Sequence, residues 1–333
     1  MDKNTLTVEG KTIRADKIVI ATGKVSRPLN IQNTGYLYTS DDFLLLKKLP
    51  KSVAFIGGGY VGMELAHMAA RYGCKVTIIE KEERILKTFD ADLVDQLVEY
   101  SKEMGINMIF NAEIDSVEKL RKNYCLNYSV NGQNQTLKAR MIFNTSGRIP
   151  AIGELDLEKG NVKYNNKGVV VDAYLKNPSN SSVYACGDVS AHSLPLSPLS
   201  GMEAKVVAHN ILNKTREKLN VSAVPSAVFT LPNLASVGLS ETEAKKKYKN
   251  IIVKHDAVPY WYNSKRVNNK IYAYKILINK RTNLIVGAHI LGPNAAESIN
   301  LFTLSMHQQL TVKSLREMVF VYPTWAYDIK NML

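Results

Sequence analysis

With 333 residues, the chain is too long for one compact core, and two or three domains are expected. Its hydrophobic fraction of 45% and charged fraction of 22% are typical of an ordinary soluble globular protein. The 43 basic and 30 acidic side chains give a net charge of +13, but the lysines are scattered rather than gathered into a basic stripe. We therefore expect a surface that attracts acidic small molecules, and no nucleic-acid partner.

Targeting, membrane and metal signals are weak. Met1–Asp16 is polar and lacks the apolar core of a signal peptide. The most apolar stretch, Ser52–Ala70, contains Glu64, His67 and a glycine turn, which makes it a poor membrane span. The three cysteines are far apart and have no metal-ligand spacing: Cys74, Cys125 and Cys186. We predict buried thiols, no metal, no membrane association and a cytoplasmic location.

The first predicted element is a tight hairpin, in which Thr5–Val8 and Lys11–Arg14 flank Glu9-Gly10. A short apolar strand within ADKIVIATG then leads into a glycine turn.

A β-α-β unit follows from Lys51. It has a buried strand at Val53–Ile56, a glycine turn, a helix ended by Gly73 and a second strand in CKVTIIE. A helix at Ala91–Glu103 precedes further strands in INMIFN, around VEKL, and in YCLNYSV and QTLKARMIFN. This order predicts a parallel sheet with right-handed crossovers.

The pattern changes beyond Ile149. SSVYACGD predicts a strand that enters a glycine turn, and Gly201–Leu212 predicts a helix. From Ala223 the chain has the pattern of a separate α+β unit, with strands in IYAYKILIN and LIVGAHILG. We predict four parts, at residues 1–48, 49–146, 147–220 and 221–333.

One strand-to-turn plan occurs twice. IVIATGKVSRP (Ile18–Pro28) and MIFNTSGRIPAI (Met141–Ile152) both have an apolar strand, Thr or Ser, Gly, and then a basic residue and Pro. The repeat predicts two related nucleotide-binding domains in one chain.

A dinucleotide fingerprint follows the strand at Val53–Ile56. Gly57, Gly59 and Gly62 form GxGxxG, in which the glycines permit a tight turn, close approach of a pyrophosphate and close packing of helix on strand. Glu80 ends the next strand, where a carboxylate can accept hydrogen bonds from a ribose diol and would repel a 2′-phosphate. This favours NAD, although Lys81 and Arg84 lie near and leave NADP open. The alternative is a packing turn with a solvated glutamate.

These motifs together resemble the pyridine nucleotide-disulfide oxidoreductase family, which includes glutathione reductase and dihydrolipoamide dehydrogenase. GGGYVGMELA with VTIIE resembles the family's nicotinamide-binding core, and ATGKVSRP and TSGRIPAI resemble its two ATG motifs. SSVYACGD resembles the second flavin motif. The resemblance implies that Asp188 and Gly187 hold the ribitol of FAD, that Thr22 and Gly23 belong to the cofactor site, and that Gly147 lies near the nicotinamide.

Two further residues follow from the resemblance. Glu64 matches a family glutamate beside the flavin and nicotinamide, the alternative being an ordinary helix acid. Ser197 falls in a further flavin-contacting turn, and the aspartate-to-turn spacing is one residue longer here. The alternative for Asp188 is a helix or turn cap. Ala223–Leu333 resembles the family's dimerisation domain, which implies a homodimer.

The chain departs from the family in two places. The closing YPTWAYDI has Tyr322 where the family has a histidine acid/base, and Tyr327 where it has a glutamate. A phenol, with a typical pKa of ~10, is poorly matched to proton transfer at neutral pH. Tyr322 could instead donate a hydrogen bond, or pack beside Trp325. The family's N-terminal FAD fingerprint and CxxxxC motif do not occur upstream of Ala21. The enzyme hypothesis therefore predicts an upstream segment in the natural gene product, and a true start at Met1 is the alternative.

The expected fold is therefore α/β, with Rossmann-like FAD- and NAD(P)-binding domains and a C-terminal α+β dimerisation domain. The expected function is that of an FAD-dependent oxidoreductase, in which hydride passes from NADH to flavin and then to a small-molecule acceptor, a disulfide being one candidate. The alternative is a nucleotide-binding, homodimer-forming module without catalytic turnover.

Overall fold

The computed structural model describes residues 4–213 and 216–333, which form two compact units. Unit 1 joins Met1–Arg27 to Gly147–Val221, and unit 2 joins Pro28–Ser146 to Ser222–Leu333. The first two changes between units fall inside the repeated motifs. The segment 28–48, which we assigned to the first of the four predicted parts, belongs to unit 2. The four-part division of the chain stays a prediction.

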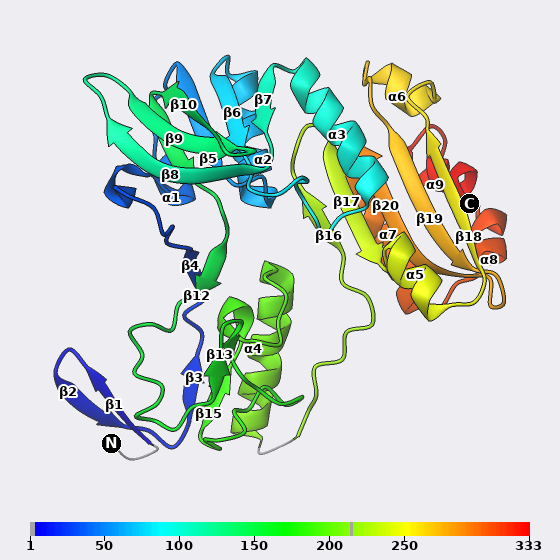
Figure 1. Cartoon of the computed structure of the whole chain (residues 1–333). Coiled ribbons are helices and arrows are strands. Elements are labelled where there is room, and N and C mark those ends of the chain that lie inside the picture. The colour runs from blue at the N-terminus through cyan, green and yellow to red at the C-terminus, as the bar shows by residue number, and fades with distance from the viewer. Residues whose placement is uncertain (1–3, 214–215) are drawn as a thin grey trace. The chain divides into compact units, whose positions relative to one another are not determined.

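Unit 2 contains the predicted parallel sheet. Its strand order is β11-β5-β6-β7, and each pair is parallel. Figure 1 labels β5, β6 and β7 of this sheet. The strands are β5 (Ser52–Ile56), β6 (Lys75–Ile79), β7 (Ile106–Ile109) and β11 (Met141–Asn144), with helices α2 (Tyr60–Arg71) and α3 (Ala91–Glu103) between them. The continuous apolar runs of β5 and β6 are buried, as expected for a parallel sheet covered on both faces.

A three-stranded antiparallel sheet precedes β11: β8 (Ala112–Lys119), β9 (Tyr124–Val130) and β10 (Gln133–Ala139). The stretch QTLKARMIFN, which we described as a single strand segment, is divided between two sheets. The chain bends at Arg140, whose backbone N–H donates to Ser52 O, and then enters the parallel sheet. The shorter elements η1 (Thr34–Tyr36) and α1 (Ser40–Leu44) come before β5.

The C-terminal part of unit 2 is a five-stranded antiparallel sheet of order β16-β17-β20-β19-β18. Its strands are β16 (Ser226–Val228), β17 (Asn233–Gly238), β18 (Ile251–Ala257), β19 (Ala273–Asn279) and β20 (Leu284–Gly292). Its helices are α5 (Glu241–Lys247), α6 (Tyr262–Arg266), α7 (Ala295–His307), α8 (Val312–Glu317) and α9 (Trp325–Met332). Alternation along β19 puts Ile276 in the core formed with α7, whereas Lys275 meets α3 and α5.

One hydrophobic core joins the parallel sheet of unit 2 to its five-stranded antiparallel sheet. It contains Phe55 and Phe143 from the parallel sheet together with Val228, Leu234 and Leu291 from the antiparallel sheet. The shared core explains why the dinucleotide fingerprint and the C-terminal domain fall in one compact unit.

Unit 1 is built from short strands and the 16-residue helix α4. The strands pair as β1-β2, β4-β12, β13-β14 and β15-β3, and only the last pair is parallel. The elements are β1 (Thr5–Val8), β2 (Lys11–Arg14), β3 (Ile18–Ile20), β4 (Lys24–Ser26), β12 (Arg148–Pro150), β13 (Tyr164–Asn165), β14 (Gly168–Val169), β15 (Val183–Ala185), η2 (Gly187–Val189) and α4 (Ser197–Leu212). The predicted N-terminal hairpin is confirmed as β1-β2.

Helix α4 begins at Ser197, four residues before the Gly201 that we predicted. Pro198 lies in its first turn, where the fixed φ of proline suits a helix and its missing N–H costs nothing. Gly201 is therefore inside the helix. None of the helices in the described residues, 4–213 and 216–333, is both long and apolar enough to cross a membrane.

Candidate functional site

The glycine turn between β5 and α2 is shaped by close backbone contacts. Gly57 has a φ of +102°, and a Cβ on it would lie 2.6 Å from Ser146 Cα. A Cβ on Gly62 would lie 2.1 Å from Gly57 O, so the start of α2 packs directly on the turn. Thr145 at the end of β11 donates its hydroxyl to this turn, at 2.9 Å from both Ile56 O and Gly57 O. Glycine at positions 57 and 62 is thus required by the protein's own packing.

Gly59 differs from its two neighbours in the fingerprint. It is the N-cap of α2 and has an ordinary φ of −72°, and a Cβ there would meet nothing within 4 Å. The first backbone N–H groups of α2 point out of the N-terminal end of the helix, beside Gly59. They have no partner within the helix, and together with the helix dipole they favour the binding of a phosphate. The space at Gly59 therefore fits a ligand that approaches the backbone closely.

Glu80 follows β6 beside this turn. One oxygen of its carboxylate accepts from Gly58 N at 2.7 Å, and the other accepts from Glu82 N at 3.0 Å. Arg84, which could have favoured a 2′-phosphate, instead donates to Ala91 O at 2.9 Å and pairs with Asp95. The arginine is thus directed toward α3, while the glutamate stays at the glycine turn.

Helix α2 is also hydrogen-bonded to the segment between β16 and β17 of the C-terminal sheet. Glu64 accepts from Phe229 N at 2.9 Å, and burial raises the pKa of this carboxyl while that hydrogen bond opposes the rise. His67, which we had noted only as a polar interruption, accepts from Leu231 N through Nδ1 at 3.2 Å and contacts Ser101 Oγ at 2.9 Å. Burial lowers the pKa of His67 to about 4, so the ring is neutral.

The second acidic turn lies in unit 1. Asp188 is in η2, directly after β15, and its carboxylate is 3.8 Å from the Arg148 guanidinium. The turn is fixed by Glu203 of α4, which accepts from Gly187 N at 2.6 Å and is fully buried. Within the described residues the other oxygen of Glu203 has no hydrogen-bond partner. Sequence patterns did not single out Glu203, because one acid within an apolar helix gives no periodic signal.

The repeated motifs meet each other in unit 1. Strands β4 and β12 pair antiparallel, with Val25 opposite Ile149. The Thr22 hydroxyl donates to Ala151 O at 2.7 Å, and Ala151 N donates to Gly23 O at 3.0 Å. Gly147 has a φ of +125°, and its carbonyl accepts from Arg27 N at 2.9 Å. The two glycine crossings are therefore parts of one ribbon.

The remaining predicted residues are exposed. Ser197 is the first residue of α4, so it lies in a helical turn rather than in an irregular one. Tyr322 is 61% exposed, and its ring packs against Tyr327 at 5.0 Å and Tyr262 at 6.0 Å. The Trp325 ring lies against Tyr272 and joins the interior of the C-terminal domain, and the packing alternative for Tyr322 stays open.

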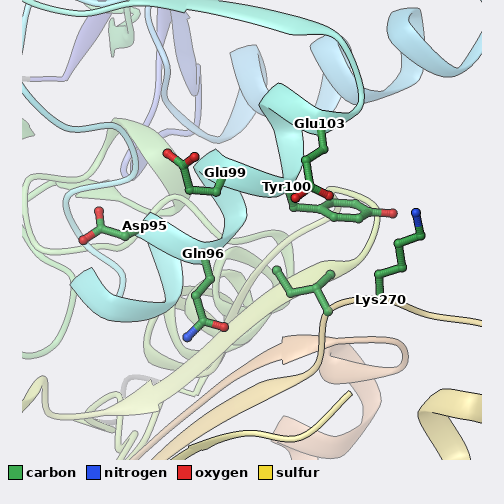
Figure 2. Close-up of a pocket in the computed structure, with 7 residues that line it drawn as sticks. Asp95, Gln96, Glu99, Tyr100, Glu103 and Lys270 are labelled. Carbon is green, nitrogen blue, oxygen red and sulfur yellow. The ribbon is translucent and has the colours of Figure 1, made fainter. Parts of the chain in front are cut away.

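Neither the thiols nor the groove beside α3 marks a reactive centre. Cys125 and Cys186 are buried, Cys74 is only partly so, and burial raises the pKa of the Cys74 and Cys186 thiols. No group of three or more metal-ligating side chains is found in residues 4–213 and 216–333. A groove of about 360 Å³ lies between α3 and residues 270–271 and contains none of the predicted site residues (Figure 2).

A parallel sheet with this glycine turn and an acidic strand end defines a dinucleotide-binding protein of the α/β class. Residues 1–216 match the model of the pyridine nucleotide-disulphide oxidoreductases, and residues 224–333 match the model of that family's dimerisation domain. The chain therefore belongs to the pyridine nucleotide-disulphide oxidoreductase family, as the sequence motifs predicted.

Individual proteins agree with this assignment. The chain is 33% identical to a mercuric reductase of Staphylococcus aureus over 99% of its length, and 30% identical to a dihydrolipoyl dehydrogenase of Geobacillus stearothermophilus over 97%. It covers 60% of the first relative and 70% of the second. The HOCl-induced flavoprotein disulfide reductase RclA of Escherichia coli shares the fold with a TM-score of 0.90 and 26% identity, over 99% of this chain and 76% of that one.

Proposed function

We propose that this chain binds NADH and FAD and serves the transfer of hydride from NADH to the flavin, and from there to a small-molecule acceptor. The observation that carries the proposal is the glycine turn at Gly57–Gly62, where the protein's packing explains two glycines and leaves open space at Gly59. A dinucleotide pyrophosphate fits that space.

The chain's own residues give the nucleotide site its preference. Glu80 is held at the turn by two backbone N–H groups and can accept from a ribose diol through its remaining lone pairs. Arg84 is engaged by Ala91 and Asp95. A 2′-phosphate would face a carboxylate without a free guanidinium, so NADH is the proposed partner rather than NADPH.

The flavin residues that we propose lie in unit 1. Asp188 would accept from the ribitol hydroxyls, because its side chain is 21% exposed while Glu203 fixes the preceding Gly187. Thr22, Gly23 and Ser197 are proposed for the same cofactor, with Gly147 and Glu64 near the nicotinamide. When bound, nicotinamide and flavin supply the hydride chemistry, and the chain's residues orient them.

For the molecule that accepts electrons from the flavin, we propose only a chemical class. The relatives are named for mercuric ion, dihydrolipoyl groups and disulfides. Tyr322 stands at the family's acid/base position with an exposed ring, so its hydroxyl would position an acceptor by hydrogen bonding. We further propose a homodimer formed through residues 224–333, a cytoplasmic location, and no nucleic-acid or metal partner.

The first experiment is a spectrum of the purified chain followed by an NADH titration. Flavin absorption bands that bleach with NADH would establish the redox function. A colourless protein that binds NADH would favour the alternative, a nucleotide-binding and dimer-forming module. A protein that binds neither cofactor contradicts the proposal.

The Glu80→Arg variant tests the site itself. We expect NADH affinity to fall by at least about tenfold and NADPH affinity to rise, since a hydrogen bond to a charged group contributes ~1.5–3 kcal/mol. The matched control is Glu83→Arg, which makes the same charge change at an exposed residue of the same loop. Equal preferences in the two variants would refute the role of Glu80.

A further inference from the structure

A buried ion cluster joins the nucleotide-binding sheet to the C-terminal sheet. Lys275 of β19 has a side chain only 4% exposed, and its ammonium lies 2.9 Å from Asp90, 2.5 Å from Asp92 and 3.0 Å from Glu241. Burial alone would lower the pKa of Lys275, but the hydrogen bonds that its ammonium donates to the three carboxylates raise the pKa above its ordinary value. The lysine is therefore charged, and all three of its donors are used.

The cluster fixes the beginning of α3. Asp90 is the N-cap of this helix, and its side chain accepts from Leu93 N at 3.4 Å. Farther along the helix, the groove of about 360 Å³ separates the face that carries Asp95, Glu99 and Glu103 from Lys270 (Figure 2). Lys275 thus holds the N-terminal end of α3 where the helix meets the C-terminal sheet, whereas Glu99 and Glu103 farther along the helix border the groove.

The same helix end is continuous with the loop that carries Glu80. In this loop, Leu86 N donates to Gly58 O at 3.3 Å, and Ile85 packs where a Gly58 side chain would be. Gly58 N in turn donates to Glu80. Contacts therefore run without a break from Lys275 through Asp90 and the loop to the carboxylate at the ribose site.

We infer that Lys275 is a positioning residue for the nucleotide site: it holds the 80–90 loop so that Glu80 discriminates NADH from NADPH. This inference rests on the proposed nucleotide site and assigns part of its specificity to a residue of the C-terminal domain. Lys275 acts through Asp90 and the loop and is not proposed to touch the cofactor.

The test compares NADH and NADPH affinities of the full chain by cofactor fluorescence. In Lys275→Met we expect the preference for NADH to fall by about 2- to 30-fold, the range for residues that act on a site through intervening contacts. Partial unfolding would scale both affinities equally and leave their ratio unchanged. The matched control is Lys254→Met, which removes the same charge at an exposed position of the neighbouring strand β18 and should keep the ratio.

A second variant guards against misfolding of the first. Asp90→Asn keeps a good helix cap and removes one charge from the cluster, so it should lower the ratio in the same direction. If the folded variants keep the wild-type ratio of NADH to NADPH affinity, the role of Lys275 is overturned while the proposed nucleotide site stands. Failure of both variants to fold has the same consequence. A wild-type chain that binds both nucleotides equally overturns this inference and the role of Glu80. One that does not bind NADH contradicts the proposed function itself.

Discussion

Units 1 and 2 each present an acidic side chain beside a glycine turn, but they support it differently. In unit 2, Glu80 lies at the end of a four-stranded parallel sheet and is held by backbone N–H groups of the turn. In unit 1, Asp188 follows β15, which belongs to a sheet of two strands, and its nearby charge is Arg148 at 3.8 Å. Of the two, Glu80 has the wider sheet behind it and the closer partners.

This difference teaches that the two proposed cofactor functions can be separated. The glycine turn of unit 2 is shaped by close backbone packing, whereas in unit 1 Glu203 holds Gly187 and Arg148 lies beside Asp188. We expect nucleotide binding to depend on packing inside unit 2, and flavin binding to depend on individual polar contacts in unit 1.

The largest expected effect comes from Gly62→Ala. The added Cβ would lie 2.1 Å from Gly57 O and 2.9 Å from Thr145 Oγ1, so the helix must move off the sheet. We expect destabilisation at or above the upper end of the ~1–3 kcal/mol typical of overpacking, together with loss of NADH binding. Urea unfolding and NADH titration measure both.

Gly59→Ala is its matched control. The methyl group meets no protein atom within 4 Å, so stability should change little while NADH affinity falls because the methyl group occupies the approach to the backbone. If Gly59→Ala binds NADH as well as the wild type does, the space at Gly59 is not the pyrophosphate site.

Acidic pH should destabilise the fold less than Gly62→Ala does, and the loss of stability should be confined to unit 2. The folded-state pKa of His67 is lowered from 6.5 to about 4, so its neutral form stabilises the fold fully above pH 6.5 and progressively less as the pH falls toward 4. The shift corresponds to roughly 3 kcal/mol. Both tryptophans, Trp261 and Trp325, lie in unit 2 and report its unfolding.

The His67→Asn variant provides the comparison. Asparagine can still accept from Leu231 N but does not titrate, so its stability should be flatter between pH 6.5 and 4 than that of the wild type. Parallel pH profiles for the two proteins would show that another group causes the acid sensitivity.

The smallest effect on the fold is expected from Asp188→Asn in unit 1. Stability and NADH affinity should match the wild type, while any FAD affinity falls by about tenfold or more, since a hydrogen bond to a charged acceptor is lost. Fluorescence titrations with each cofactor provide the measurement. A parallel loss of NADH and FAD binding would show that the two sites are not separable.

Much of the fold followed from local patterns. The helix at Ala91–Glu103 and the strands of the parallel sheet were predicted because buried strands and amphipathic helices have distinct periods. Local patterns do not locate the start of α4, because Gly201 resembles a helix boundary but lies inside the helix. They do not divide QTLKARMIFN either, because one bend separates the two sheets. Boundaries depend on single residues, which periodicity does not resolve.

The sequence by itself determined the family and the dinucleotide fingerprint, because glycine spacing and strand ends are local properties of the chain. Only the tertiary structure decided how these residues are supported. It paired the two repeats in one ribbon, placed Lys275 among Asp90, Asp92 and Glu241, and buried Glu203 beneath Gly187. Those contacts join residues far apart in the chain, and they form because a buried charge or polar group must find a partner wherever the fold provides one.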